Sequence, residues 1–271
     1  MTNSEGAQVL HADQRVVVTG AGNGIGRALA ARFASEGHRV VVNDIDPVAT
    51  REVADTIGGI PAPGDAASEA GVAALLDAAR DALGGIDVFC ANAGTERGLG
   101  LDAAEGDWSA GFELNVLAHV RAARGLVPDW LERGEGRFIA TASAAGLLTM
   151  LDSPVYSVTK HGAVAFAEWL SATYRHRGIR VHAICPQGVD TRMLRDSGPL
   201  QDLLAHDQVL TPDDVADALW RALARDDFLV LPHAQVGAYY TARAQDPDRW
   251  LSGMNRLQQR LEASAPPPTS H

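Results

Sequence analysis

This chain of 271 residues has two cysteines, one lysine and no long apolar run. Cys90 and Cys185 lie in separate apolar segments without metal-binding spacing, so we predict reduced core thiols rather than a disulfide or a metal site. No apolar stretch approaches the roughly 18 residues of a membrane span. Residues 1–13 lack the apolar centre of a signal peptide. These absences predict a cytoplasmic protein that does not cross a membrane.

Positive charge is scarce as well. The chain carries 23 lysine and arginine residues against 34 aspartate and glutamate residues, which gives a formal net charge of −11. Proteins that bind nucleic acids do so through clustered cations. The composition therefore argues against a DNA or RNA partner and favours a small-molecule substrate.

Short apolar runs alternate with segments of helical spacing along the chain. Strands are predicted at 15–19, 38–43, 59–63, 86–91, 137–142, 179–185 and 228–231, and helices at 26–36, 47–57, 68–83, 105–133, 154–176 and 212–225. Continuously apolar strands separated by helices are typical of a parallel sheet covered on both faces.

The length favours one domain. We predict a single domain over residues 1–263, with a core at 14–232 and an extension at 233–263. Residues 264–271, which include three consecutive prolines, are predicted to be a disordered tail.

A glycine-rich turn, Gly20 to Gly26, joins the first predicted strand to the first predicted helix. Glycine lets the backbone approach a pyrophosphate, and the start of the helix offers free N–H groups and a positive dipole end. The spacing Gly-x3-Gly-x-Gly differs from the strict Gly-x-Gly-x-x-Gly dinucleotide pattern. Its position between a strand and a helix still favours a phosphate site.

The second predicted strand ends at Asp44, which precedes Ile45. A carboxylate at this place accepts hydrogen bonds from an adenosine ribose and repels a 2′-phosphate. Neither Asn23 in the turn nor Ile45 supplies a cation that could neutralise such a phosphate, so we predict NAD rather than NADP. The alternative is that Asp44 caps the next helix or forms a turn.

The single lysine, Lys160, lies four residues after Tyr156. Residues four apart share one face of a helix, with Cβ atoms about 6 Å apart. A tyrosine titrates near pKa ~10, and a cation roughly 4 Å away contributes on the order of 4 kcal/mol at an effective dielectric constant of about 20. Lys160 is therefore expected to lower the pKa of Tyr156 toward neutrality, where a general base is most useful. The alternative is a surface lysine beside a half-buried core tyrosine.

Taken together, these residues resemble the short-chain dehydrogenase/reductase family in its single-domain branch. The resemblance covers residues 15–231 and rests on an ordered set: the Thr19 to Gly26 turn, Asp65 with Ala66, Asn92-Ala93-Gly94, Asn115, Ser143, and the pair Tyr156 and Lys160. It implies a Rossmann-like doubly wound parallel sheet of about seven strands in a three-layer α/β/α arrangement.

The resemblance also implies the chemistry. The chain is expected to be an NAD-dependent oxidoreductase that acts on a secondary alcohol or ketone. Tyr156 would exchange a proton with the substrate oxygen, while Lys160 lowers its pKa and bonds the nicotinamide ribose. Ser143 would bond the same substrate oxygen, and Asn115 would fix a helix kink and a proton-relaying water. Viewed alone, Ser143 could instead cap a strand end and Asn115 could be a solvated helix residue.

A larger set of residues is implied to bind the cofactor. These are Gly20, Asn23, Gly24, Ile25, Gly26, Asp44, Ile45, Asp65, Ala66, Asn92, Ala93, Gly94, Tyr156, Lys160, Pro186, Val189 and Thr191. Gln187 departs from the family, which usually has glycine after this proline, so the local backbone or carboxamide contact is expected to differ. None of the nine histidines forms a convincing metal pair, and we predict no catalytic metal.

Substrate pockets of open α/β sheets form beyond the carboxyl ends of the strands. The candidate segments are 96–98, 144–152 and 192–210, and their leucines and methionines favour an uncharged, lipophilic alcohol or ketone. The same residues could instead pack a lid or a subunit contact. Residues 237–261 would fold over the pocket or a neighbouring subunit. Family resemblance implies a homodimer or homotetramer.

Two other functional classes stay open at this point. The fold could serve a non-catalytic nucleotide-binding sensor or scaffold. It could also serve an epimerase or dehydratase that recycles its cofactor. Net reduction of NAD by a panel of secondary alcohols would exclude both.

Overall fold

The computed structural model describes residues 10–196 and 208–264. Its described strands form one parallel sheet in the order β3-β2-β1-β4-β5-β6-β7. They are β1 (Arg15–Val18), β2 (Arg39–Val42), β3 (Ile60–Pro61), β4 (Val88–Ala91), β5 (Gly136–Thr141), β6 (Ile179–Ile184) and β7 (Leu229–Val230).

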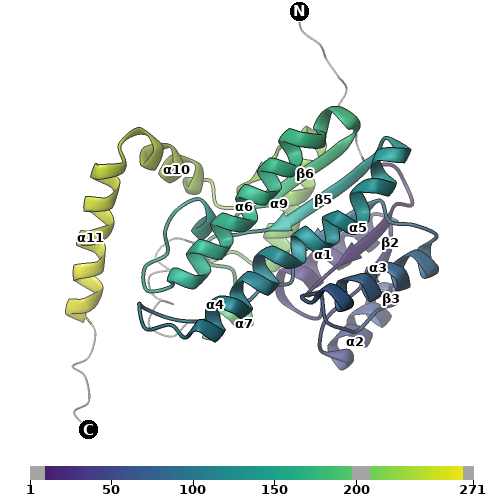
Figure 1. Cartoon of the computed structure of the whole chain (residues 1–271), viewed down its shortest axis with the longest axis horizontal. Helices are drawn as coiled ribbons and strands as arrows, with labels where there is room; N and C mark the ends of the chain where they lie inside the picture. The colour runs from purple at the N-terminus through teal and green to yellow at the C-terminus, as the bar shows by residue number, and fades with distance from the viewer. Residues whose placement is uncertain (1–9, 197–207, 265–271) are drawn as a thin grey trace, which may run out of the picture.

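Helices connect the strands and continue beyond the last one (Figure 1). The α-helices are α1 (Gly24–Ser35), α2 (Pro47–Ile57), α3 (Glu69–Leu83), α4 (Glu105–Phe112), α5 (Ala118–Arg133), α6 (Pro154–Tyr174), α7 (Arg192–Asp196), α9 (Pro212–Arg225), α10 (Gln235–Gln245) and α11 (Pro247–Ser264). A π-helix, η1 (Glu113–Leu117), and two 3-10 turns, η2 (Ala144–Gly146) and η3 (Arg175–Arg177), complete the described set.

The two faces of the sheet bury separate hydrophobic clusters. Side chains of a strand alternate between faces, so Val17 and Phe89 pack with α3, α5 and α6, whereas Val16 and Val88 pack with α1, α2 and α9. Both faces are therefore apolar. This confirms the predicted doubly wound parallel sheet with helices on both faces.

The order of the sheet decides where a ligand can bind. From β1 the chain moves outward through β2 and β3, then returns to place β4 on the other side of β1. The connections that follow β1 and β4 therefore leave in opposite directions and open a crevice at the carboxyl ends of these strands. The glycine-rich turn follows β1 directly and lies at this crevice.

Two elements differ from the prediction. The helix expected at 105–133 is divided by η1. β3 has only two residues, because it is an edge strand that ends at Pro61, which cannot donate a ladder hydrogen bond. The extension after residue 232 folds into α10 and α11, which lie to one side of the sheet (Figure 1). Residues 197–207 of the predicted pocket loop and 265–271 of the predicted tail lie outside the described residues.

An ion-pair cluster joins elements at the opposite, amino-terminal end of the sheet. Asp87 accepts hydrogen bonds from Arg15 at the start of β1 (Nε to Oδ2, 2.8 Å) and from Arg133 at the end of α5 (Nη1 to Oδ1, 2.6 Å). Burial raises the pKa of Asp87, but these hydrogen bonds outweigh it and hold the pKa well below its ordinary value. The carboxylate therefore stabilises the fold in its charged form.

Asp87→Asn is expected to lower the free energy of unfolding by about 2 kcal/mol at neutral pH, because hydrogen bonds to charged groups contribute roughly 1.5–3 kcal/mol. The folded pKa lies below the unfolded value, so this stabilisation is present above about pH 4 and is lost as the pH falls further. Urea unfolding at neutral and at acid pH checks both points. The exposed carboxylate in Asp129→Asn serves as the control, with an expected change within about 1 kcal/mol. If Asp87→Asn and the unmutated protein still differed in their free energy of unfolding at acid pH, the stabilisation would not come from the charged carboxylate.

Candidate active site

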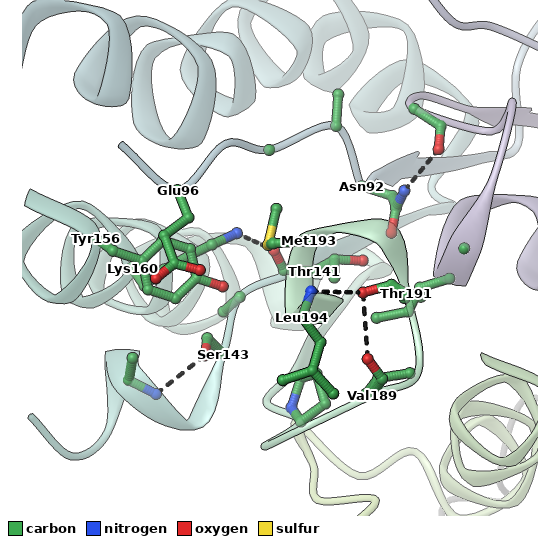
Figure 2. Close-up of a pocket in the computed structure, with 18 of the residues that line it drawn as sticks. Asn92, Glu96, Thr141, Ser143, Tyr156, Lys160, Val189, Thr191, Met193 and Leu194 are labelled. Atoms are coloured by element: carbon green, nitrogen blue, oxygen red, sulfur yellow. Dashed lines mark hydrogen bonds between the residues drawn. The ribbon is translucent and has the colours of Figure 1, made fainter. Parts of the chain in front are cut away.

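A cavity of about 780 Å³ opens at the carboxyl ends of the central strands. Every residue that the sequence predicted to bind the cofactor lines it, from Gly20 in the first turn to Thr191 before α7. Ser143, Tyr156 and Lys160 line it too (Figure 2). Asn115 is not among the lining residues, since it lies fully buried behind the wall.

The glycine-rich turn packs so closely against neighbouring backbone that Gly20 and Gly26 leave no room for a side chain. Gly20 has a φ of 60°, and a Cβ there would stand 2.8 Å from the Cα of Ala93. A Cβ on Gly26 would stand 2.1 Å from the carbonyl oxygen of Gly20. The turn therefore lies flat against the exit of β4 and presents its backbone to the cavity, as a pyrophosphate requires.

Asp44 is fixed at the nucleotide end of the cavity. Its carboxylate accepts from the backbone N–H of Gly22 (2.9 Å) and of Asp46 (3.1 Å). The alternative that Asp44 caps the next helix is wrong. The cap of α2 is Asp46, whose side chain accepts from the N–H groups of Val48 and Ala49. Asp44 does form a local turn, but its main effect is to direct a negative charge to the glycine turn.

The exit of β4 is tied to the first turn. The side-chain amide of Asn92 donates to the carbonyl oxygens of Thr19 (3.0 Å) and Gly20 (3.2 Å), and the Thr19 hydroxyl accepts from the N–H of Ala93 (3.0 Å). Figure 2 shows Asn92 directed to this turn. Asp65 accepts from the N–H groups of residues 67 and 68 and lines the cavity next to Ala66.

Asn115 is a buried hydrogen-bonding centre rather than a solvated helix residue. It lies in η1, is 0% exposed, accepts from the N–H of Thr95 (2.9 Å), and donates to the carbonyl oxygen of Thr95 (2.9 Å) and the hydroxyl of Thr159 (3.0 Å). A π-turn widens the helix and changes its direction. The family resemblance implied a helix kink at Asn115, and the structure has a π-helix there, whose Asn115 joins the loop after β4 to α6.

Tyr156 and Lys160 share the buried face of α6. The ammonium nitrogen of Lys160 lies 5.6 Å from the centre of the Tyr156 ring and donates to the carbonyl oxygen of Thr141 (2.8 Å) at the end of β5. Both side chains are buried, so the reading of Lys160 as a surface residue is wrong. Ser143 accepts from the N–H of Ala145 (3.1 Å), which makes it a cap of η2 as well as a wall of the cavity.

Burial is the largest influence on the pKa values of Tyr156 and Lys160. Burial raises the pKa of Tyr156 to about 12, with a hydrogen bond to Ser143 opposing it and the charge of Glu96 adding to it. Burial likewise lowers the pKa of Lys160 to about 8. The lowering of the Tyr156 pKa toward neutrality that we expected from Lys160 is thus not found. Loss of water destabilises the phenolate more than the contribution of Ser143 stabilises it.

Gln187, the departure from the family pattern, is accommodated without a left-handed backbone. It is not among the described non-glycine residues with positive φ. Its N–H donates to Nδ1 of His233 (3.1 Å), and its side-chain oxygen accepts from Gln235 of α10 (3.0 Å). The replacement therefore ties the exit of β6 to the C-terminal extension.

The part of the cavity away from the glycine turn is mostly apolar. Its walls come from the loop before α6, from α7 and from the C-terminal helices, and they include Leu148, Met150, Leu151, Met193, Leu194, Tyr239, Trp250, Met254 and Leu257. Sequence reasoning expected residues 237–261 to fold over the pocket or a neighbouring subunit, but it did not single out Met254 and Leu257 as lining residues. Their spacing along α11 is the helical signal that could have found them. Arg97 is not among the lining residues; its Nε donates to Thr95 (3.2 Å).

No described group of three or more His, Cys, Asp or Glu side chains is placed to hold a metal ion. Within the same residues, every helix is too short or too polar to cross a membrane.

The sequence matches known proteins over most of its length. The family model of the short chain dehydrogenases matches residues 14–201. A 1-deoxy-11-beta-hydroxypentalenate dehydrogenase of Streptomyces exfoliatus is 37% identical over 243 residues, which cover 86% of this chain and 87% of that protein. The enzyme of the same description from Streptomyces arenae is 35% identical and covers 89% of each chain.

Solved structures agree with these matches. A short chain dehydrogenase/reductase from Burkholderia phymatum, in complex with NAD, superposes with a TM-score of 0.80 at 28% identity and covers 88% of this chain and 95% of its own. A 7 alpha-hydroxysteroid dehydrogenase complexed with NADH and 7-oxo glycochenodeoxycholic acid superposes with a TM-score of 0.75 at 27% identity, covering 85% and 96%.

Gly26→Ala is expected to destabilise the fold by about 1–3 kcal/mol, the usual effect of overpacking. The added methyl group would meet the Gly20 carbonyl at 2.1 Å and the Asn92 amide at 2.5 Å. Gly106→Ala is the control, because a Cβ there meets no atom within 4 Å and alanine favours the helix. Thermal unfolding of both variants tests this, and equal melting temperatures would contradict the described packing of the turn.

Proposed function

Because this chain belongs to the short-chain dehydrogenase/reductase family, we propose that it is an NAD-dependent oxidoreductase that transfers a hydride between nicotinamide and a secondary alcohol or ketone. The observation that carries the proposal is that Tyr156 and Ser143 both line the cavity, with Lys160 buried beside the phenol ring. A sensor or scaffold has no physical need for a phenol and a hydroxyl directed at one point of a dinucleotide cavity.

The residues present fit a dinucleotide. The flat glycine turn suits a pyrophosphate, and Asp44 suits the hydroxyls of an adenosine ribose. Ile45, 78% exposed on the cavity wall, offers an apolar surface to the adenine. When bound, the nicotinamide would supply the hydride acceptor or donor.

Tyr156 is the proposed general acid and base. With a pKa near 12 its phenol is protonated at neutral pH, which suits donation of a proton to a ketone oxygen. In that direction the phenol O–H bond breaks and an O–H bond forms on the substrate. Lys160, whose pKa stands near 8, supplies positive charge beside the phenolate that remains. In alcohol oxidation the same proton moves the other way.

The substrate is proposed to be a lipophilic alcohol or ketone. The apolar wall described above supports this class, because it removes hydrocarbon from water. The hydroxypentalenate and hydroxysteroid dehydrogenases are both named for hydroxyl-bearing molecules, and this likeness supports a hydroxyl-bearing substrate for this chain. A cytoplasmic homodimer or homotetramer remains the expectation, supported by family membership alone.

Cofactor choice is tested by titration with NAD and NADP. NAD is expected to bind at least tenfold more tightly, because Asp44 lines the cavity beside the glycine turn and repels a 2′-phosphate. Asp44→Asn is expected to reduce this preference, whereas Asp55→Asn, on the exposed side of α2, leaves it unchanged. Similar affinities of the unmutated protein for the two dinucleotides would defeat the prediction.

Tyr156→Phe is expected to reduce turnover of a secondary alcohol by 10²-fold or more while NAD binding stays within a fewfold, because only the transferable proton is lost. Lys160→Arg is also expected to be badly impaired, because a planar guanidinium does not replace a compact ammonium in this buried space. The absorbance of reduced nicotinamide measures both. Tyr240→Phe, on an exposed tyrosine outside the cavity wall, is the control. An active Tyr156→Phe enzyme would end the proposed role.

A further inference from the structure

The methionines of this chain gather on one wall of the cavity. Besides Met1 the chain has three, Met150, Met193 and Met254, and all three line the cavity. The cavity wall takes in about one residue in seven of the chain, so three methionines placed at random would all fall there about once in 300 chains. Chance placement therefore does not account for them.

The three methionines come from separate parts of the chain. Met150 lies in the loop before α6, Met193 in α7 and Met254 in α11, and all belong to the apolar part of the cavity away from the glycine turn. Figure 2 shows Met193 among the residues that line the cavity together with Tyr156. The fold thus brings them to the place where the carbon skeleton of a substrate would lie.

The core of the protein does not use methionine. Methionine commonly fills irregular gaps in hydrophobic cores, which is the structural explanation for its presence. The buried hydrophobic residues of the described chain, however, include none. Met193 is 38% exposed, and Met150 and Met254 are partly exposed. Gap filling in the core therefore does not explain where these residues lie.

The rest of the cavity is stiffer. Close backbone contacts fix the glycine turn, and Lys160 is held by the carbonyl oxygen of Thr141. On the apolar wall itself, Tyr239 and Trp250 form a tilted aromatic pair with ring centres 6.4 Å apart. Methionine instead has an unbranched side chain with three rotatable bonds and a polarisable sulfur, so it adjusts to the shape of what it contacts.

We infer that Met150, Met193 and Met254 form an adaptable wall that accepts hydrocarbon skeletons of different shape. The substrates are then a class of uncharged ring-bearing secondary alcohols or ketones rather than one compound. The inference rests on the proposed function, which places the reacting carbon at Tyr156. In a shaped apolar pocket one methylene changes the discrimination between substrates by roughly 10- to 200-fold. An adaptable wall reduces such differences, at the cost of ordering flexible side chains in every complex.

The test uses three secondary alcohols, borneol, menthol and decalin-2-ol, which have the same number of carbon atoms but a globular, a flat and an elongated skeleton. Calorimetric titration in the presence of NADH measures their affinities, because the cofactor in that complex is already reduced. The unmutated protein is expected to bind all three within about threefold of one another.

The combined variant Met150→Ile, Met193→Ile and Met254→Ile replaces flexible side chains by stiff, β-branched ones. It is expected to spread the three affinities over about thirtyfold or more. The shape that fits best should bind at least as tightly as it does to the unmutated protein, because less side-chain freedom is lost. A wall that was merely damaged would bind every shape more weakly. Leucine at the same three positions is expected to give a spread of about tenfold.

The matched control combines Leu99→Ile, Leu101→Ile and Leu251→Ile, three exposed leucines outside the described cavity wall, and is expected to keep the narrow spread. Thermal unfolding shows whether each variant is folded, and the leucine variant carries the test should the isoleucine variant unfold. A spread of about thirtyfold in the unmutated protein, no binding of any of the three alcohols, or a spread unchanged in every folded methionine variant would overturn the inference.

Turnover with NAD is recorded separately for the three alcohols. Absence of reduced nicotinamide with all of them would count against the proposed oxidoreductase, while the ratios of the affinities still judge the methionine wall. Oxidation of one shape alone, with the other two bound far more weakly, would keep the enzyme proposal and remove the adaptable wall.

Discussion

The burial of a lysine ammonium beside a tyrosine phenol is the constraint on which the site depends. Lys160 is 3% exposed, and an unpaired charge at such a place would be very costly. The carbonyl oxygen of Thr141 at the end of β5 accepts from it. This contact joins α6 to the sheet at its carboxyl edge, so the position of Tyr156 follows from how the charge is stabilised.

The same burial sets the protonation of the pair. A simple pairing of charges predicts an acidic phenol, but loss of water shifts the pKa of Tyr156 upward and that of Lys160 downward. The two groups therefore move toward their neutral forms together. A protonated phenol beside a weakly basic amine is suited to give a proton to a carbonyl oxygen and to take it back in the reverse reaction.

The sheet edge and the C-terminal extension line different parts of the cavity. The parallel strands bring the turn after β1 and the exit of β4 together, where glycines allow the backbones to touch. Residues beyond the sheet then build the other wall. Gln187 ties this edge to α10 through Gln235, and α11 contributes Trp250. The sheet edge thus carries the glycine turn, while the C-terminal helices line the apolar part of the cavity.

By itself, the sequence determined the parallel sheet and the glycine turn, because strand periodicity and motif spacing are local properties. The larger set of predicted cofactor residues came from the family resemblance, and all of them line the cavity. Only the tertiary structure decided three other features. The hydrogen-bond partners of Asn115 are Thr95 and Thr159, which lie 20 and 44 positions away in the chain. The pKa shifts arise from burial, which spacing does not reveal. The bond between Ser153 and Glu96 replaces a local cap by a contact across 57 positions, and such exchanges depend on packing rather than on propensity.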